Sequence, residues 1–196
     1  MCPRIVVKRT QDVRSLRWGL GALALCVAVG VHVGTTAARG TAAAVEPIVW
    51  SSVVRMIELM WPAVQQLPTA ELAWRIEAHE PVLLIDTRAK EEYLVCHPPG
   101  AVWAESPAQL RAAVSKVPAT PLIVLYCSVG VRSSKTAAML MRDGGHTVAN
   151  LRGSIFQCAN EGRALEADGR AAMQVHPYNR VWGQLLEPRL RASGAQ

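Results

Sequence analysis

Several features that would indicate a metal, repeat or disulfide architecture are missing from this 196-residue chain. It has no internal repeat, no low-complexity tract and no CxxC pair at the spacing of a zinc site. Its cysteines are too scattered for a disulfide framework, lying at Cys2, Cys26, Cys96, Cys127 and Cys158. We therefore expect neither a metal site nor a cofactor.

Charge is missing from Trp18 to Ala38, unless His32 is protonated. This run of 21 residues is close to the roughly 20 that span a bilayer, so it predicts a membrane anchor. Five basic residues and one acid precede it, which predicts an extracytoplasmic domain, periplasmic in a bacterium. The run is rich in Gly and Ala and Ala42–Ala44 offers a cleavage site, so a cleaved signal or an organelle transit peptide stays open.

Acidic residues are scarce only in this leader. Residues 1–44 contain six basic side chains and one acid, whereas residues 45–196 contain fifteen basic and fourteen acidic ones. The positive net charge of +6 therefore belongs mostly to the leader. Nucleic-acid binding would need a basic face on the folded domain, so we expect no nucleic-acid partner.

A candidate nucleophile, Cys127, lies between an apolar run, Pro121–Tyr126, and a segment of helix-forming residues, Ser134–Met141. The apolar run is typical of a strand buried on both faces. Free N–H groups at the start of a helix would lower the pKa of the thiol, as would the nearby arginine. A small buried hydrophobic role for the cysteine is the alternative. The candidate anion-binding loop comprises Ser128, Val129, Gly130, Val131, Arg132 and Ser133. Ser133 and Ser134 are residue types that commonly cap the start of a helix.

A second segment begins with another buried-type strand, Val82–Ile85, followed by a short acidic helix or turn. Together the two segments resemble the rhodanese-like family. The first part of its pattern is met by Asp86, Arg88, Glu92, Tyr93, His97, Pro99, Gly100 and Ala101. The cysteine loop matches at Cys127, Gly130, Arg132 and Ser133, and Asn150–Gly162 is similar to the family's closing strand, turn and helix. The resemblance covers roughly Thr69–Gly162.

The resemblance implies a sulfurtransferase. Cys127 would take the outer sulfur of a small anionic donor such as thiosulfate as a persulfide, and a thiol or cyanide would accept it. Arg132 and the loop amides would bind the anions, while Asp86 and Arg88 would form a structural ion pair and His97 would be a hydrogen-bonding turn residue. The alternative is a membrane-tethered binding or regulatory module in which Cys127 catalyses no reaction. Only four residues separate Cys127 from Arg132, which disfavours a phosphatase loop.

Four positions depart from the family's pattern: Cys96, Pro98, Ser154 and Cys158. The last stands where the family usually has tryptophan, so we expect a void there unless Phe156 or Trp182 fills it. Cys96 and Cys158 could alternatively be resolving thiols that pair with Cys127.

The predicted fold is α/β: a single rhodanese-like domain with a mainly parallel sheet and helices on both faces. We expect a leader (1–44), an amphipathic helix or linker (45–68) and the domain with a C-terminal extension (69–196). The expected helix, Ile48–Gln66, would pack on the domain or bind a membrane or partner, with Pro62 kinking or ending it. Thr69 would cap a second helix, and Val175–Leu186 would cover the core. Strands are expected at Val82–Ile85, Ala101–Trp103, Leu122–Tyr126 and Thr147–Leu151.

Overall fold

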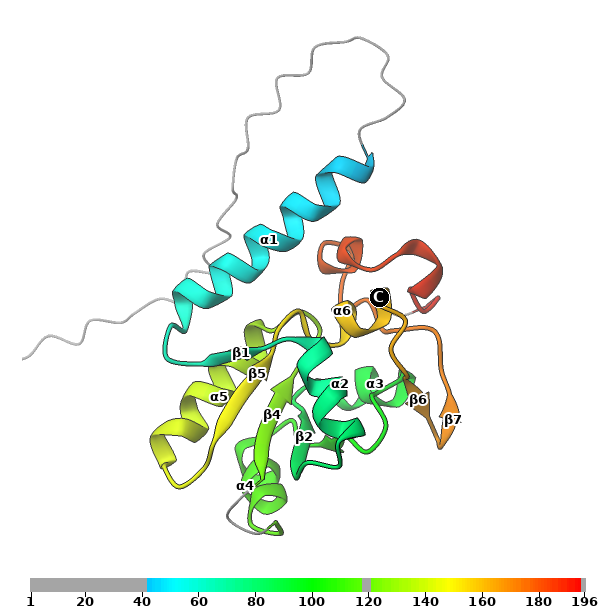
Figure 1. Ribbon diagram of the computed structural model, residues 1–196. Helices are drawn as coiled ribbons and strands as arrows, with labels where there is room; N and C mark the ends of the chain where they lie inside the picture. Colours follow the sequence, from blue (N-terminus) through cyan, green and yellow to red (C-terminus); the bar gives the residue numbers. More distant parts are fainter. Residues whose placement is uncertain (1–41, 118–120, 195–196) are drawn as a thin grey trace, which may run out of the picture. The chain divides into compact units, whose positions relative to one another are not determined.

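Five parallel strands form the central sheet, in the order β1-β5-β4-β2-β3 (Figure 1). The structure is a computed structural model that describes residues 42–117 and 121–194, and only the backbone of residues 42–49. The four predicted strands are confirmed to within about one residue at each end. The strands are β1 (Gln65–Leu67), β2 (Val82–Asp86), β3 (Val102–Trp103), β4 (Leu122–Tyr126) and β5 (Val148–Leu151).

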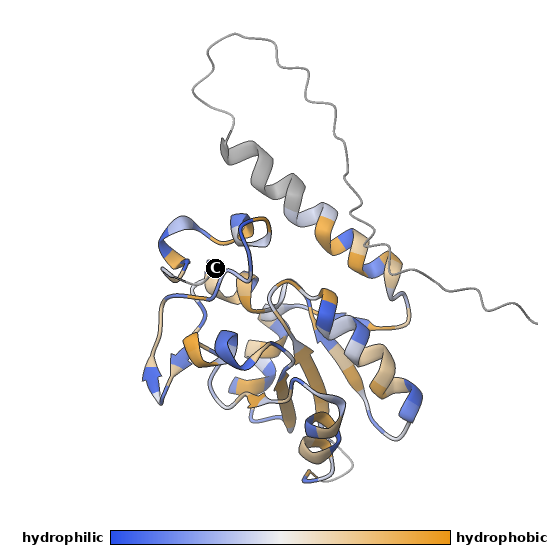
Figure 2. Cartoon of the chain, turned by 180° about the vertical axis from the view of Figure 1, so that it is seen from behind, coloured by the Kyte–Doolittle hydropathy of each residue, from blue (hydrophilic) through white to orange (hydrophobic). Residues whose placement is uncertain are grey.

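Helices cover both faces of the sheet, as predicted. Alternate residues of β4 face opposite sides, with Val124 in one core cluster and Ile123 in the other. One cluster includes side chains of α2 (Thr69–Glu77) and α6 (Ser154–Asn160), and the other includes those of α4 (Pro107–Val114) and α5 (Val131–Asp143). The central strands are therefore largely hydrophobic in Figure 2.

Strand β1 corrects the prediction of a helix through Gln66. Helix α1 spans Ala42–Met60 and ends before Pro62, because proline supplies no N–H to continue it. The chain then pairs with β5, placing Leu67 beside Leu151. Three residues are too few to show a strand pattern in sequence.

Helix α1 packs on the domain through one face. Trp50 and Val53 contact the first core cluster and Ile57 is 1% exposed. Leu59 and Met60 are exposed on the same helix. Packing against the domain, one of the two expected roles, is thus confirmed for the inner face.

Two helix starts differ from expectation. The N-cap position of α2 is Pro68, and Thr69 does not cap it but donates to Glu161 Oε2 at 2.5 Å. Helix α5 begins at Val131 with Gly130 as its N-cap residue, so Ser133 lies inside the first turn instead of capping it.

The remaining elements are short. They are α3 (Lys90–Val95), the hairpin of β6 (Glu166–Ala167) and β7 (Arg170–Ala171), and the 3-10 helices η1 (Trp182–Leu185) and η2 (Pro188–Leu190). Among the described residues, no helix combines the length and the apolar character that crossing a bilayer requires. The predicted anchor, Trp18–Ala38, lies outside the described residues.

Candidate functional site

The carboxyl ends of β2 and β4 bring the two predicted segments together. Asp86 is paired with Tyr126 in the sheet register, so the residues that follow each strand share one edge. Thr87 donates its amide to Tyr126 O at 3.0 Å and its hydroxyl to the same oxygen at 2.9 Å. These two hydrogen bonds hold Tyr126, the residue directly before Cys127, in place.

The cysteine loop folds back on the thiol. Gly130 donates its N–H to Cys127 Sγ at 3.2 Å. The glycine has φ of +113°, and a Cβ there would lie 3.2 Å from Ile57 Cδ1 and from Asn150 Nδ2. A side chain would be strained at that φ and crowded by two neighbours, so glycine is what permits this turn.

Helix α6 fixes the loop from the other side. Cys127 N donates to Ser154 Oγ at 3.2 Å, and the first turn of α6 donates Ile155 N to Cys127 O and Phe156 N to Ser128 O. Ser154, one of the departures from the family's pattern, is thus a hydrogen-bond acceptor for the loop. Its role could not be read from the sequence.

Cys127 is 1% exposed, yet its thiol is acidified. Burial raises the pKa of the thiol, but the Arg132 charge and hydrogen bonds from Ser133 and Gly130 outweigh it, leaving the pKa below its ordinary value. The Ser133 hydroxyl has one proton, and geometry directs it to Asn150 Oδ1 at 2.5 Å. The backbone amides are therefore the donors that remain directed at sulfur.

Arg132, a predicted anion-binding residue, is paired with a carboxylate at the loop. Its Nη1 and Nη2 donate to the two oxygens of Glu92 at 2.7 and 2.8 Å, and Nη2 donates to Ser128 Oγ at 2.9 Å. Ser128 donates its hydroxyl to Glu92 as well. The guanidinium is positioned by this carboxylate, with 32% of the Arg132 side chain still exposed.

Glu92 is the partner that sequence reasoning missed. Burial raises the pKa of its carboxyl, but the hydrogen bonds and charge of Arg132 outweigh burial, so the pKa lies below its ordinary value. The residue belonged to the recognised pattern but carried no assigned role. The signal available was that the pattern contains this second acidic residue besides Asp86, and an arginine placed beside a buried thiol needs a carboxylate partner.

The predicted Asp86–Arg88 ion pair is confirmed. Arg88 Nη2 lies 2.6 Å from Asp86 Oδ2, and both side chains are fully buried. Tyr126 OH donates to the same carboxylate at 2.6 Å, and Arg88 Nη2 donates to Cys96 O at 2.6 Å. The pair ties β2, β4 and the end of α3 together below the loop.

His97 is a turn residue, as predicted. Its ring stacks on Tyr93 with centroids 3.9 Å apart, and its Nδ1 lies 3.1 Å from Tyr93 O. Its backbone N–H and C=O pair with those of Glu166 in a bridge to the hairpin. These contacts serve the turn, and none of them involves the cysteine loop.

The other described cysteines are unlike Cys127. Cys96 and Cys158 are buried free thiols, so the alternative in which either is paired with Cys127 is not what the structure shows. Burial raises the pKa of Cys96 to about 11 and that of Cys158 to about 12. Both would be far less reactive than Cys127 at neutral pH.

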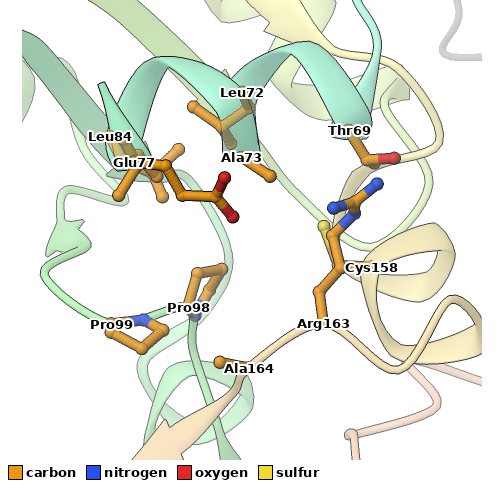
Figure 3. A pocket seen from close by; sticks show the side chains of 11 residues that line it. Thr69, Leu72, Ala73, Glu77, Leu84, Pro98, Pro99, Cys158, Arg163 and Ala164 are labelled. Atoms are coloured by element: carbon orange, nitrogen blue, oxygen red, sulfur yellow. The ribbon is translucent and has the colours of Figure 1, made fainter. Parts of the chain in front are cut away.

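Cys158, where a void was expected, lines a pocket. A pocket of about 310 Å³ opens beside it, between α2 and the Pro98–Pro99 turn (Figure 3). Neither Phe156 nor Trp182 lines it. The lining residues are Thr69, Leu72, Ala73, Ile76, Glu77, Leu84, Pro98, Pro99, Cys158, Arg163 and Ala164, so the pocket is separate from the cysteine loop.

The C-terminal segment covers the core, as predicted, through buried Val175, Leu185 and Leu186. It also reaches the site, which was not predicted: the Tyr178 ring lies over Arg132, with the guanidinium carbon 4.5 Å from the ring centroid. Among the described residues, no group of three or more His, Cys, Asp or Glu side chains is arranged to hold a metal ion.

Comparison with known proteins relates this chain to one family. The sequence profile of the rhodanese-like domain matches residues 69–161. A sulfurtransferase from Allochromatium vinosum is 33% identical over 105 residues, which cover 53% of this chain and 96% of the relative. The crystal structure of a thiosulfate sulfurtransferase from Pseudomonas aeruginosa aligns with a TM-score of 0.52 at 21% identity, covering 63% of this chain and 23% of that chain. At that identity, the second likeness shows a shared fold.

Proposed function

The chain belongs to the rhodanese-like family, and from that premise we propose that it is a sulfurtransferase that carries sulfur as a persulfide on Cys127. The observation that carries this proposal is the placement of Cys127 at the end of β4, where the Gly130 N–H donates to its Sγ at 3.2 Å and the Arg132 charge lowers the pKa of the thiol. Both favour the thiolate, which is the form that attacks sulfur. The sulfurtransferase relative and the family profile support the reaction class.

In the first step, the Cys127 thiolate attacks the outer sulfur of thiosulfate. A new S–S bond forms to Cys127, the S–S bond of the donor breaks, and sulfite leaves with the bonding electron pair. The outer sulfur of the persulfide then carries the negative charge. The Gly130 N–H, which donates to Cys127 Sγ, would stabilise the attacking thiolate, and Arg132 would meet the anionic donor through its exposed part.

In the second step, a nucleophilic acceptor attacks the outer sulfur. Cyanide leaves as thiocyanate and a thiolate leaves as a persulfide, and in either case the electron pair of the broken S–S bond returns to Cys127. The enzyme thus alternates between two covalent states. No oxidant or reductant is consumed beyond donor and acceptor.

The size of the loop favours sulfur over a phosphoryl group. Only four residues separate Cys127 from Arg132, and the amide of Gly130 is directed at Sγ itself. A ring of this length surrounds a small anion.

The alternative function is a rhodanese-like binding or regulatory module. One observation favours it: Cys127 is 1% exposed and the arginine beside it is engaged by Glu92. A thiol covered in this way could have a structural role and form no persulfide.

Intact-mass analysis of the full chain after incubation with thiosulfate tests the proposal. We expect a gain of one sulfur atom that cyanide or a thiol removes, and we expect none in Cys127→Ser. Cys158→Ser is the matched control and should still gain sulfur, because its pKa of about 12 makes Cys158 a poor nucleophile. Arg132→Ala should need more thiosulfate. An unmodified wild-type chain across several donors would favour the module.

We also propose that residues 18–38 anchor the protein in a membrane with the domain on the extracytoplasmic side, periplasmic in a bacterium. The length of this uncharged run and its basic flank support the proposal. The full chain should stay in the membrane pellet after alkaline carbonate extraction. Release into the supernatant would favour a cleaved, exported form.

A further inference from the structure

The chain beyond residue 161, outside the stretch that matches the family, returns to the cysteine loop. Tyr178 comes from this C-terminal segment, and the centroid of its ring lies 4.5 Å from the guanidinium carbon of Arg132. Contact of a guanidinium with the face of a tyrosine ring is attractive, because the face of the ring is electronegative. The contact joins two residues that the sequence separates widely.

A tightly built turn holds Tyr178 in place. Its φ of +64° is in the left-handed region, which costs a non-glycine residue about 1–2 kcal/mol. Tyr178 N donates to His176 Nδ1 at 3.0 Å, and Asn179 N donates to Pro177 O at 2.8 Å. A strained conformation persists where its surroundings determine it, and such residues gather at functional sites.

Hydrogen bonds also fix this turn to η1. Asn179 Oδ1 accepts from Val181 N at 3.0 Å and from Trp182 N at 2.9 Å. Trp182 packs against the core cluster, and an ideal Cβ on Gly183 would lie 2.9 Å from Pro177 Cβ, so the backbone approaches the proline closely. Tyr178 is therefore attached to the core through several independent contacts.

Arg132 is held from two directions as a result. Glu92 binds its N–H groups in the plane of the guanidinium, and the Tyr178 ring lies over the guanidinium. The charge of Arg132 also lowers the pKa of the Cys127 thiol, together with the loop hydrogen bonds. Whatever restrains this guanidinium controls how its charge acts on sulfur.

We propose that Tyr178 is a positioning residue of the cysteine site, acting through Arg132 to keep the guanidinium beside Cys127. This deepens the proposed function, because it makes the C-terminal segment part of the sulfur-transfer site. Removing the ring lets Arg132 move toward solvent while its ion pair with Glu92 loosens. The Cys127 thiolate then loses part of its stabilisation.

The test compares two variants that, like the native tyrosine, place a non-glycine residue at a positive φ. Tyr178→Leu keeps a bulky apolar side chain without an aromatic face, and Tyr178→Phe keeps the face without the hydroxyl. Alkylation of Cys127 by iodoacetamide is followed in the full chain by peptide mass spectrometry from pH 5 to pH 10. Val181→Ala, in the same turn and 71% exposed, is the matched control.

We expect Tyr178→Leu to move the alkylation profile of Cys127 to higher pH and to lower its rate near neutral pH by about two- to fivefold, the range that such a contact is worth. Tyr178→Phe and Val181→Ala should follow the wild type. In an Arg132→Ala background, Tyr178→Leu should produce no additional change, since its effect passes through the guanidinium.

Three results would overturn the proposal: a wild-type profile in Tyr178→Leu, an equal loss in Tyr178→Phe, or a full loss on top of Arg132→Ala. The measurement reads the Cys127 thiolate and needs no turnover. A chain that takes up no sulfur would therefore refute the sulfurtransferase while leaving this test intact.

Discussion

Glu92 sets the charge balance around the cysteine loop at the level of single residues. Its carboxylate accepts from both terminal nitrogens of Arg132, from Ser128 Oγ and from Ala89 N while only 2% of the residue is exposed. Charge-assisted hydrogen bonds of this kind are strong when they are buried and costly to leave unmade. One side chain thus links α3, the loop and the first turn of α5.

Replacing Glu92 with Gln should destabilise the fold by about 1–3 kcal/mol, because Arg132 loses its charged acceptor. Urea unfolding at pH 7 measures this. Glu91→Gln is the matched control: Glu91 is the exposed neighbour in the same helix, and its variant should unfold like the wild type. Equal midpoints for the two variants would contradict the role assigned to Glu92.

The same pair predicts an acid dependence. The pKa of folded Glu92 lies below its ordinary value, so the unfolded chain binds the proton more readily. The stabilisation is present above about pH 4, the ordinary range of a glutamate, and is lost as the pH falls through the folded pKa. Glu92→Gln should therefore lose less stability than the wild type over this acid range.

At the scale of elements, α1 forms a wall of the cysteine loop. Ile57 is buried, and its Cδ1 lies where only a glycine at position 130 leaves room. The helix precedes the stretch matched to the family, so the loop also contacts an element that lies on the N-terminal side of that stretch. Leu59, on the other face of α1, is 63% exposed and does not have to fit against the loop.

Ile57→Ala should lower the free energy of unfolding by about 2–5 kcal/mol, through lost burial and the cavity left beside Gly130. Thermal and urea unfolding measure it. Leu59→Ala, two residues along the same helix, should change it by no more than about 0.5 kcal/mol. If both variants unfolded alike, α1 would not be packed as described.

At the scale of the whole molecule, one asparagine of α6 hydrogen-bonds the C-terminal segment to the domain, in addition to the burial of Val175, Leu185 and Leu186. Asn160 Nδ2 donates to Leu185 O at 2.7 Å, and Glu187 N donates to Asn160 Oδ1 at 3.0 Å. Val175 pairs with Leu190 and Ala192 through backbone hydrogen bonds at the end of the same segment. The segment that carries Tyr178 is thereby closed on itself and attached to the sheet domain.

Asn160→Ala should release this segment locally, because two backbone groups lose their partner at a cost of about 1–3 kcal/mol. Hydrogen exchange should accelerate in peptides covering residues 175–192 and stay unchanged in β4. Gln157→Ala, on the same helix and bonded only to Glu161 through its side chain, is the control and should leave residues 175–192 protected. Unchanged exchange in Asn160→Ala would show that the segment is held in another way.

The sequence by itself determined the parts of this protein that local pattern encodes. Buried-type runs located the two central strands β2 and β4, and adjacency along the chain placed Cys127 at a strand end and Asp86 two residues from its partner Arg88. Cys158, whose small side chain predicted a void, lines a pocket. The anchor at Trp18–Ala38 stays a prediction, as do the roles proposed for the site residues.

Tertiary structure decided the rest. Strand β1 is too short to show a period and exists because β5 offers an open edge to pair with. Glu92 and Arg132 lie 40 residues apart, and neither Tyr178 nor Ile57 belongs to the matched stretch, yet all surround one loop. Contacts between distant side chains depend on how whole elements pack, and that packing minimises the free energy of the entire chain, which no local window of sequence contains.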